Sequence, residues 1–341
     1  MASSQPMQVL ITIPLADDLL ARLQRLSPLL KVTHIPARKV EEIPVEVWNR
    51  TEILYTAWLM PDPELVPNLR WIQSHLAGVD YALSSPILAQ ENVRFTTLSG
   101  AAASQVAEFA LTMMLALGHR VPALLEAQSG AEWPEYRYKR FNPVEIRGAT
   151  VGLVGYGSIA RQLARLLHPM GASILAIKRD VLHPADDGFI YEDEGDPHGD
   201  YFTRLYPVQA LHSVLKKCDY VVLTLPLTNE TRGLFGEKAL AAMKPGSFLI
   251  QVGRGGVIDE DALLKSLQDG HLGGAALDVF QHEPLPAEHP FWRLPNMIIS
   301  PHIAWLSPHY NERAMALFSE NLHRYLAGSP LLNQYKPERG Y

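Results

Sequence analysis

The sequence predicts an α/β protein of two domains, each built on a doubly wound parallel sheet. The chain has 341 residues, which is too many for one ordinary hydrophobic core. Short apolar runs alternate with polar segments along most of its length, as strands and helices do in α/β proteins. From residue 150 onward this alternation becomes regular, which is typical of a parallel sheet with helices on both faces.

The composition is that of a globular protein and argues against several classes of function. Hydrophobic residues make up 47% of the chain and charged residues 19%, and the net charge of −6 argues against a nucleic-acid-binding surface. The single cysteine, Cys218, excludes a disulfide framework or a thiolate metal site, and we expect no metal. The first residues lack the basic region of a signal peptide, and no apolar run reaches the ~18 residues of a membrane span. We therefore expect a cytoplasmic protein without membrane association.

The first hundred residues read as one α/β region, and an unusually apolar helix follows them. Residues 7–100 contain the apolar runs VLITI, ILYTAWLM and LRWIQSHL between polar or Pro-containing segments. Residues 104–118 are apolar nearly all round, which predicts a helix from an N-cap at Ser104 to Gly118. Such a helix must be covered on every side, either in a core between domains or at a subunit interface. We expect a homodimer formed through this region.

The regular part of the chain predicts a parallel sheet of six strands. The predicted helices between them are 159–170, 207–218 and 260–268, and the predicted strands are 150–155, 173–177, 220–225, 247–252, 274–279 and 297–300. The exception is 181–206, whose acidity and lack of periodicity predict a solvated surface loop without a chemical role.

The last helix is expected to return to the N-terminal domain. Ser307 is its predicted N-cap and Pro308 its first residue, and no further strand follows that it could cover. Packing against the first region would make that domain discontinuous. The predicted domains are therefore 1–101 with 307–341, and 102–306 inserted between them.

A glycine turn marks a candidate dinucleotide site. In VGLVGYGSIA, the pattern Gly155-x-Gly157-x-x-Ala160 follows a strand and opens a helix. Gly155 allows the tight turn, Gly157 allows the backbone to approach a pyrophosphate, and the helix N-terminus offers free amides to that anion. This context predicts a Rossmann-like cofactor domain in which the turn itself binds the cofactor, through Gly155, Tyr156, Gly157, Ser158 and Ile159.

Two cations stand where this motif usually has an acid. A carboxylate about 20 residues after the turn binds the ribose hydroxyls of NAD, but here Lys178 and Arg179 follow the second strand. Both would pair with a 2′-phosphate, so NADP(H) is favoured. NAD(H) stays possible, because both cations could be solvated and Asp180 could serve as a displaced ribose ligand.

Three further strand ends carry polar candidates. Arg254 lies in a Gly-flanked turn after one strand, Asp278 ends another with Glu283 five residues later, and His302 follows the last. In an open parallel sheet, ligands bind outside the carboxyl ends of the strands, so these side chains are expected at one edge.

These motifs together resemble the D-isomer-specific 2-hydroxyacid dehydrogenases. The glycine turn, LPLTNETRGLF, GRGGVIDEDAL, AALDVFQHEPLP and SPHIAW occur in the order of that family, and PNLRWIQSHLAGVDYAL and VAEFALTMMLALGHR extend the resemblance over most of the chain. The resemblance implies two Rossmann-like domains, the cofactor domain inserted in the substrate domain. It also implies an NAD(P)-dependent oxidoreductase acting on a small 2-keto or 2-hydroxy acid.

The resemblance also implies a role for each candidate. His302 would be the acid/base, Glu283 would orient it, and Arg254 would bind the substrate carboxylate and polarise the carbonyl. Trp305 resembles the glyoxylate/hydroxypyruvate reductases, where it could close the pocket around a short side chain, although it could equally pack at a subunit interface. Further implied contacts are the backbone of Ala77, Gly78 and Val79 for the substrate, and Leu225, Pro226, Val252, Gly253, Arg254, Asp278 and His302 for the cofactor.

Two alternatives to a 2-keto acid reductase stay open at this point. Related corepressors are nucleotide-sensing interaction proteins that retain the same three catalytic residues. A phosphite dehydrogenase would use the same scaffold.

Overall fold

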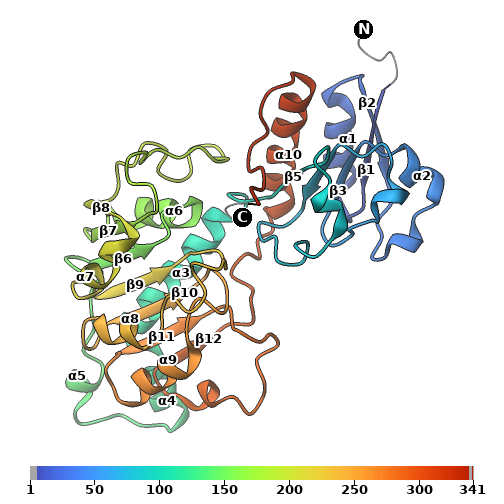
Figure 1. Cartoon of the computed structure of the whole chain (residues 1–341). Coiled ribbons are helices and arrows are strands. Elements are labelled where there is room, and N and C mark those ends of the chain that lie inside the picture. Colours follow the sequence, from blue (N-terminus) through green and yellow to red (C-terminus); the bar gives the residue numbers. More distant parts are fainter. Residues whose placement is uncertain (1–5, 338–339, 341) are drawn as a thin grey trace. The chain divides into compact units, whose positions relative to one another are not determined.

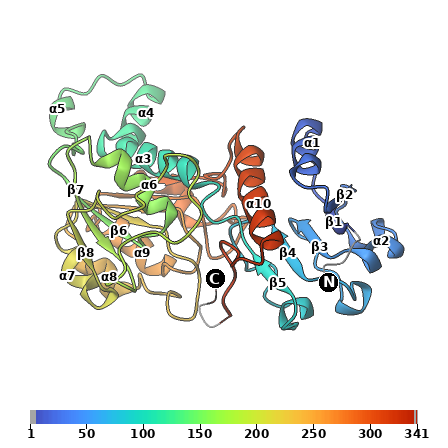
Figure 2. The same ribbon diagram turned by 90° about the horizontal axis from the view of Figure 1, so that it is seen from above.

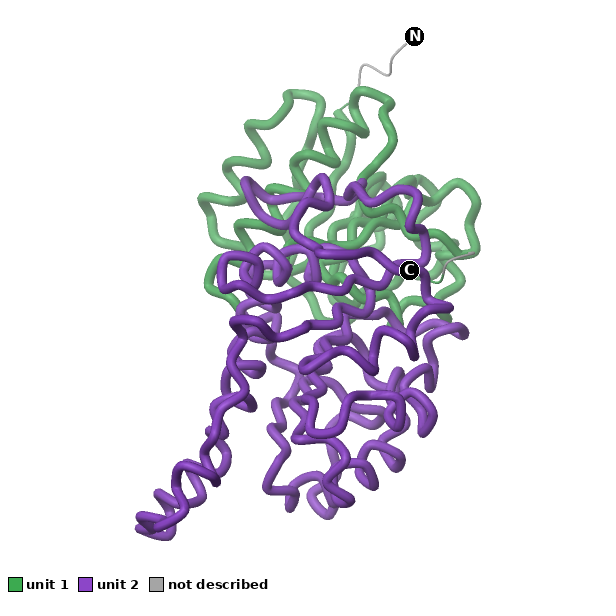
Figure 3. Tube along the Cα trace, turned by 90° about the vertical axis from the view of Figure 1, so that its left-hand side faces the viewer, with its two compact units in different colours: residues 1–102, 307–341 green, residues 103–306 purple. Residues whose placement is uncertain are grey.

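The structure, a computed structural model, describes residues 6–337 and 340. The chain divides into two compact units, of which unit 1 comprises residues 1–102 and 307–341 and unit 2 comprises residues 103–306 (Figures 1 and 3). Each unit contains one sheet, and every pairing between its strands is parallel. The predicted α/β class with parallel sheets is confirmed.

Unit 1 is a five-stranded sheet in the order β2-β1-β3-β4-β5. Two of its inner strands, Ile53–Thr56 and Trp71–Ser74, are buried along their whole length because helices cover the sheet. The strands are β1 Met7–Ile11, β2 Leu30–His34, β3 Ile53–Thr56, β4 Trp71–Ser74 and β5 Arg94–Thr96, and the helices are α1 Asp17–Leu26, α2 Val45–Arg50 and α10 Tyr310–Leu326. Three 3-10 turns, Val40–Glu42, Pro63–Leu65 and Pro86–Ala89, complete it.

The C-terminal helix α10 packs on the strands of unit 1. The ring of Phe318 lies 4.6 Å from that of Tyr55 and 5.5 Å from that of Trp71, measured between centroids. The Asn321 side chain donates a hydrogen bond to Gln73 Oε1 at 3.2 Å. The predicted start of this helix is wrong, because α10 begins at Tyr310 and the Ser307 hydroxyl instead accepts from the His309 amide in the preceding turn.

Unit 2 is a seven-stranded sheet in the order β12-β11-β10-β9-β6-β7-β8. Its strands are β6 Thr150–Val154, β7 Ser173–Ile177, β8 Arg204–Tyr206, β9 Tyr220–Leu223, β10 Phe248–Gln251, β11 Gly274–Leu277 and β12 Met297–Ile299. Its helices are α3 Ala103–Gly118, α4 Val121–Ser129, α5 Arg137–Arg140, α6 Ser158–Leu167, α7 Leu211–Leu215, α8 Glu237–Ala242 and α9 Glu260–Gln268, with 3-10 turns at Val208–Ala210 and Pro290–Arg293.

The strand order places the switch point of this sheet between β6 and β9. The chain moves outward from β6 through β7 to β8 and then, from β9 to β12, in the opposite direction. Helices α3 and α6 lie on one side of the sheet and α7 and α8 on the other (Figure 2). In a doubly wound sheet the crevice at such a point, outside the carboxyl ends of the strands, is where ligands bind.

The apolar helix α3 covers unit 2 with one face. Its buried residues Val106, Ala110 and Met114 recur at helical spacing, and the helix contacts β10, β11 and α6. The predicted N-cap at Ser104 is wrong, since α3 begins at Ala103 and Ser104 is buried within its first turn.

The prediction of a solvated loop at 181–206 is correct only in part, because residues 181–203 form no helix or strand but are not solvated throughout. Its last residues form β8, which pairs with β7, and Asp196 is only 1% exposed. The periodicity of the sequence does not predict this packing, because the partners of the segment lie on β7, in the glycine turn and on α6.

Two absences hold for residues 6–337 and 340. No helix there is long and apolar enough to cross a membrane. No group of three or more His, Cys, Asp or Glu side chains is placed to hold a metal ion.

Candidate active site

The glycine turn lies at the switch point, between β6 and α6. Gly155 has φ +94°, and a side chain there would come within 2.9 Å of Leu225 after β9. A Cβ on Gly157 would meet no atom within 4 Å, so the space beside it is open. No side chain caps α6, whose first amides have no acceptor within the helix. These features fit the pyrophosphate of a dinucleotide, which needs close approach to free amides.

Arg254 lies on a turn that only glycines allow. A Cβ on Gly253 would lie 2.5 Å from the Leu225 carbonyl oxygen, and one on Gly255 would overlap the Phe280 carbonyl. The Gln251 side chain donates to the Arg254 carbonyl at 2.8 Å, which closes the turn. The turn therefore runs against the segments that follow β9 and β11.

His302 and Glu283 are in direct contact. His302 Nδ1 donates to Glu283 Oε2 at 2.7 Å, while the other carboxylate oxygen accepts from the Phe280 amide at 2.9 Å. The side chains are 40% and 35% exposed, so one edge of the imidazole stays accessible. His302 has φ +55°, a conformation that non-glycine residues rarely adopt and that often marks functional sites.

Asp278 anchors the segment that carries His302. The Asp278 carboxylate, 2% exposed, accepts from the Ser300 hydroxyl at 2.6 Å and from the amides of Ile303 and Ala304 at 2.9 and 3.0 Å. The amides of Ile303 and Ala304 directly follow His302, so Asp278 fixes the backbone just after His302. Sequence reasoning missed this role, although an acid and a serine at neighbouring strand ends were a visible signal. The predicted cofactor contact of Asp278 stays a prediction.

Trp305 belongs to the same segment. Its indole nitrogen donates to the His302 carbonyl at 3.2 Å, and the residue is 40% exposed. The indole ring of Trp305 is therefore held close to the backbone of His302.

Lys178 and Arg179 both have partners inside unit 2. Lys178 Nζ donates to the carbonyls of His183 and Ala185 at 2.8 and 3.4 Å, and burial lowers the pKa of Lys178. Arg179 pairs with Glu230 at 2.7 Å. Neither cation is simply solvated, so a phosphate would have to share or replace these partners.

The predicted substrate residues of unit 1 follow β4. The Leu76 amide donates to Ser74 Oγ at 3.0 Å, but within the described chain no acceptor is found for the amides of Ala77, Gly78 and Val79. Consecutive free amides of this kind attract anions.

His75 precedes this amide segment and is held as a neutral ring. Its Nδ1 lies 2.6 Å from the Tyr55 hydroxyl, and burial lowers the pKa of His75 to about 4. The Tyr310 hydroxyl donates to the His75 carbonyl at 2.8 Å. These contacts show that His75 is packed within unit 1.

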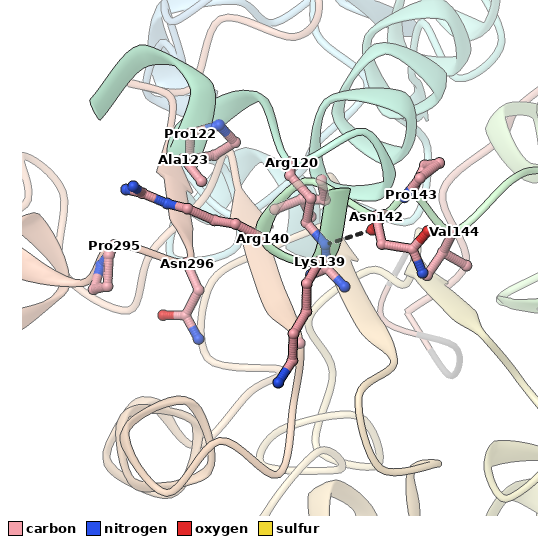
Figure 4. A pocket seen from close by; sticks show the side chains of 12 residues that line it. Arg120, Pro122, Ala123, Lys139, Arg140, Asn142, Pro143, Val144, Pro295 and Asn296 are labelled. Carbon is pink, nitrogen blue, oxygen red and sulfur yellow. Dashed lines mark hydrogen bonds between the residues drawn. The ribbon is translucent and has the colours of Figure 1, made fainter. Parts of the chain in front are cut away.

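A separate cavity of about 380 Å³ is bordered by the start of α4, the end of α5 and the loop that follows α5 (Figure 4). Three cations line it, Arg120, Lys139 and Arg140, but Arg140 is paired with Glu126 and Glu132. None of the predicted site residues lines this cavity. It is therefore distinct from the glycine turn and the strand ends.

Comparison with known proteins agrees with this geometry. Residues 111–304 match the model of the "D-isomer specific 2-hydroxyacid dehydrogenase, NAD binding domain" family. The chain is 35% identical over 283 residues to an (S)-sulfolactate dehydrogenase of Chromohalobacter salexigens, covering 82% of this chain and 83% of that one. It is 32% identical over 270 residues to a glyoxylate reductase of Thermofilum pendens, covering 78% and 74%.

A solved structure extends the similarity to the whole chain. A D-isomer specific 2-hydroxyacid dehydrogenase from Xanthobacter autotrophicus Py2, in complex with NADPH and MES, matches with a TM-score of 0.78 and 28% identity. The match covers 99% of this chain and all of that one, 100%. The predicted family and the predicted enzyme class are confirmed. The chain belongs to the D-isomer specific 2-hydroxyacid dehydrogenase family of NAD(P)-dependent oxidoreductases.

Proposed function

We propose that this enzyme reduces a small 2-keto acid of the glyoxylate or hydroxypyruvate kind to the D-2-hydroxy acid. The observation that carries the proposal is the 2.7 Å hydrogen bond between His302 and Glu283, beside the Arg254 turn. Relatives named glyoxylate reductase and glyoxylate/hydroxypyruvate reductase support the substrate class.

His302 is the proposed proton donor. Its Nδ1 proton is held by Glu283, so Nε2 is the atom that gives a proton to the substrate carbonyl oxygen. A nicotinamide held by unit 2 would supply the hydride for C2 of the keto acid. Glu283 stabilises the charged imidazole before transfer and keeps the ring oriented afterwards, when Nε2 takes up a new proton.

Arg254 is the proposed anchor for the substrate. Its planar guanidinium matches the substrate carboxylate and draws electron density from the adjacent carbonyl. The free amides of Ala77, Gly78 and Val79 are proposed as further carboxylate ligands. Trp305 is proposed to wall the pocket around a short side chain, since its ring is held close to His302.

The predicted domain 102–306, of which unit 2 comprises residues 103–306, is proposed as the dinucleotide-binding domain. The predicted domain 1–101 with 307–341, which lies within unit 1, is proposed as the substrate domain. In unit 2 the glycine turn, residues 155–159, would hold the pyrophosphate. Leu225, Pro226, Val252, Gly253 and Asp278 would line the nicotinamide side. NADPH is favoured over NADH because Lys178 and Arg179 follow β7, and the similar Xanthobacter enzyme is a complex with NADPH.

A homodimer is proposed from apolar side chains that unit 2 leaves partly buried on α3 and exposed in the α4–α5 region. On α3, Phe109 and Met113 are half-buried within unit 2. Beyond α3, Trp133, Tyr136 and Tyr138 in the α4–α5 region are 85%, 75% and 79% exposed. Aromatic residues this open commonly mark a protein interface. A cytoplasmic location is proposed from the single cysteine and the favoured NADPH.

A panel of keto acids run with both cofactors tests the function. Absorbance at the nicotinamide band should fall with glyoxylate or hydroxypyruvate and NADPH. His302→Ala should cut turnover by roughly three orders of magnitude while NADPH binding stays nearly intact. Tight NADPH binding without turnover of any keto acid would contradict the proposal and favour a nucleotide-sensing protein. Formation of phosphate from phosphite would instead identify a phosphite dehydrogenase.

A further inference from the structure

The 181–203 segment contains a buried carboxylate with a full set of donors. Asp196 accepts from the Tyr156 hydroxyl at 2.6 Å and from the amides of Gly199, Asp200 and Tyr201 at 3.0, 2.7 and 3.2 Å. Its exposed fraction is 1%. A buried carboxylate that accepts four hydrogen bonds is held in one orientation, so this segment has a defined shape despite its acidic surface.

One face of α6 holds the same segment. Arg161, 1% exposed, donates to the carbonyls of Asp196 and Pro184, each at 2.5 Å, and lies 3.4 Å from the Asp186 carboxylate. One turn later, Arg165 donates to the Asp193 carbonyl. Because residues four apart share one face of a helix, Arg161 and Arg165 lie on the same face of α6, and both bind the segment. The negative charge of the segment is thus matched by the helix that begins at the glycine turn.

The segment reaches both ends of the proposed cofactor site. Tyr156 lies inside the glycine turn, and its side chain, 2% exposed, is bonded to Asp196 with the Arg161 guanidinium 4.8 Å from its ring centre. At the other end, the carbonyls of His183 and Ala185 hold Lys178 after β7. A single segment is therefore tied to the position for the pyrophosphate and to the position for the ribose.

We propose that the 181–203 segment positions the dinucleotide site, with Tyr156 and Asp196 as its positioning residues. The inference rests on the proposed cofactor sites in unit 2. A turn with two glycines has much conformational freedom to lose, and a side chain tethered between them removes that freedom before the cofactor arrives. The tether should therefore raise the affinity for any dinucleotide, because the pyrophosphate is common to NADPH and NADH.

The test compares Tyr156→Phe and Asp196→Asn with wild type. Dissociation constants for NADPH and NADH are measured by calorimetry, and kcat and KM with glyoxylate at saturating NADPH. Both variants should raise both dissociation constants by about tenfold, the factor that about 1.4 kcal/mol produces. The kcat at saturating cofactor and the KM for glyoxylate should stay within about twofold of wild type. Asp200→Asn is the matched control, since it removes the same charge from an exposed residue of the same segment.

The outcomes separate a positioning role from a purely structural one. Unchanged dissociation constants with a lower melting temperature would overturn the proposal, and so would a loss confined to NADPH. If Asp196→Asn does not fold, Tyr156→Phe decides, because it removes one hydroxyl and leaves the ring in place. If the wild-type protein binds NADPH but reduces no keto acid, the proposed function fails, while the dissociation constants still decide this inference.

Discussion

Replacing Glu283 by glutamine tests the link between charge and catalysis most directly. The glutamine has nearly the same shape, and its carbonyl can still accept from the Phe280 amide, a bond of 2.9 Å in the native protein. It then presents an NH₂ group to His302 Nδ1, where the carboxylate accepted at 2.7 Å. The variant therefore removes the charge that stabilises the imidazolium and leaves the surrounding backbone in place.

The expected loss follows from the strength and exposure of this pair. A hydrogen bond to a charged group contributes about 1.5–3 kcal/mol. The two side chains are 40% and 35% exposed, so solvent screening places the effect at the lower end, about 1.5–2 kcal/mol. Since about 1.4 kcal/mol is a factor of ten in rate, kcat/KM should fall roughly 10- to 30-fold.

Steady-state oxidation of NADPH with glyoxylate measures this loss. Glu288→Gln is the matched control, because it makes the same change at an exposed residue of the same segment, and it should leave kcat/KM unchanged. The NADPH dissociation constant should be the same in all three proteins. A value of kcat/KM for Glu283→Gln within twofold of wild type would refute the argument that this carboxylate supports proton transfer.

Three further predictions follow from particular residues. Replacing Lys178 and Arg179 together by alanine should raise the NADPH dissociation constant about tenfold more than that of NADH, and equal effects in calorimetry would remove the phosphate role. Gly255→Ala should lower the free energy of unfolding by about 1–3 kcal/mol and reduce kcat, because its methyl group overlaps the Phe280 carbonyl and displaces the Arg254 turn; a wild-type urea midpoint and kcat would contradict this. His75 stays neutral to about pH 4 in the folded protein, whereas the unfolded chain gains its proton near pH 6.5. The free energy of unfolding should therefore fall as the pH drops through this window, by up to about 3 kcal/mol, and urea titrations of wild type and His75→Asn should differ in this slope.

Much of the candidate site was visible in the sequence because its residues follow strands. The carboxyl ends of parallel strands meet at one edge, so the positions of Arg254, Glu283 and His302 after successive apolar runs predicted their proximity. The contact between Glu283 and His302 agrees with that prediction. The starts of α3 and α10 were misplaced because several residues near each end can act as a cap, and packing decides among them.

The sequence by itself determined the alternation of strands and helices, the glycine turn and the family. These depend on local periodicity and on steric demands of single residues, such as the positive φ of Gly155. Only the tertiary structure decided that Asp278 anchors the His302 segment and that the acidic 181–203 segment is built around Asp196. Asp278 accepts from donors that lie 22 to 26 residues away along the chain, on Ser300, Ile303 and Ala304. Asp196 accepts from the Tyr156 hydroxyl, 40 residues away. Local pattern cannot report such pairs, because folding alone brings the donor to the acceptor and excludes the water that would otherwise take its place.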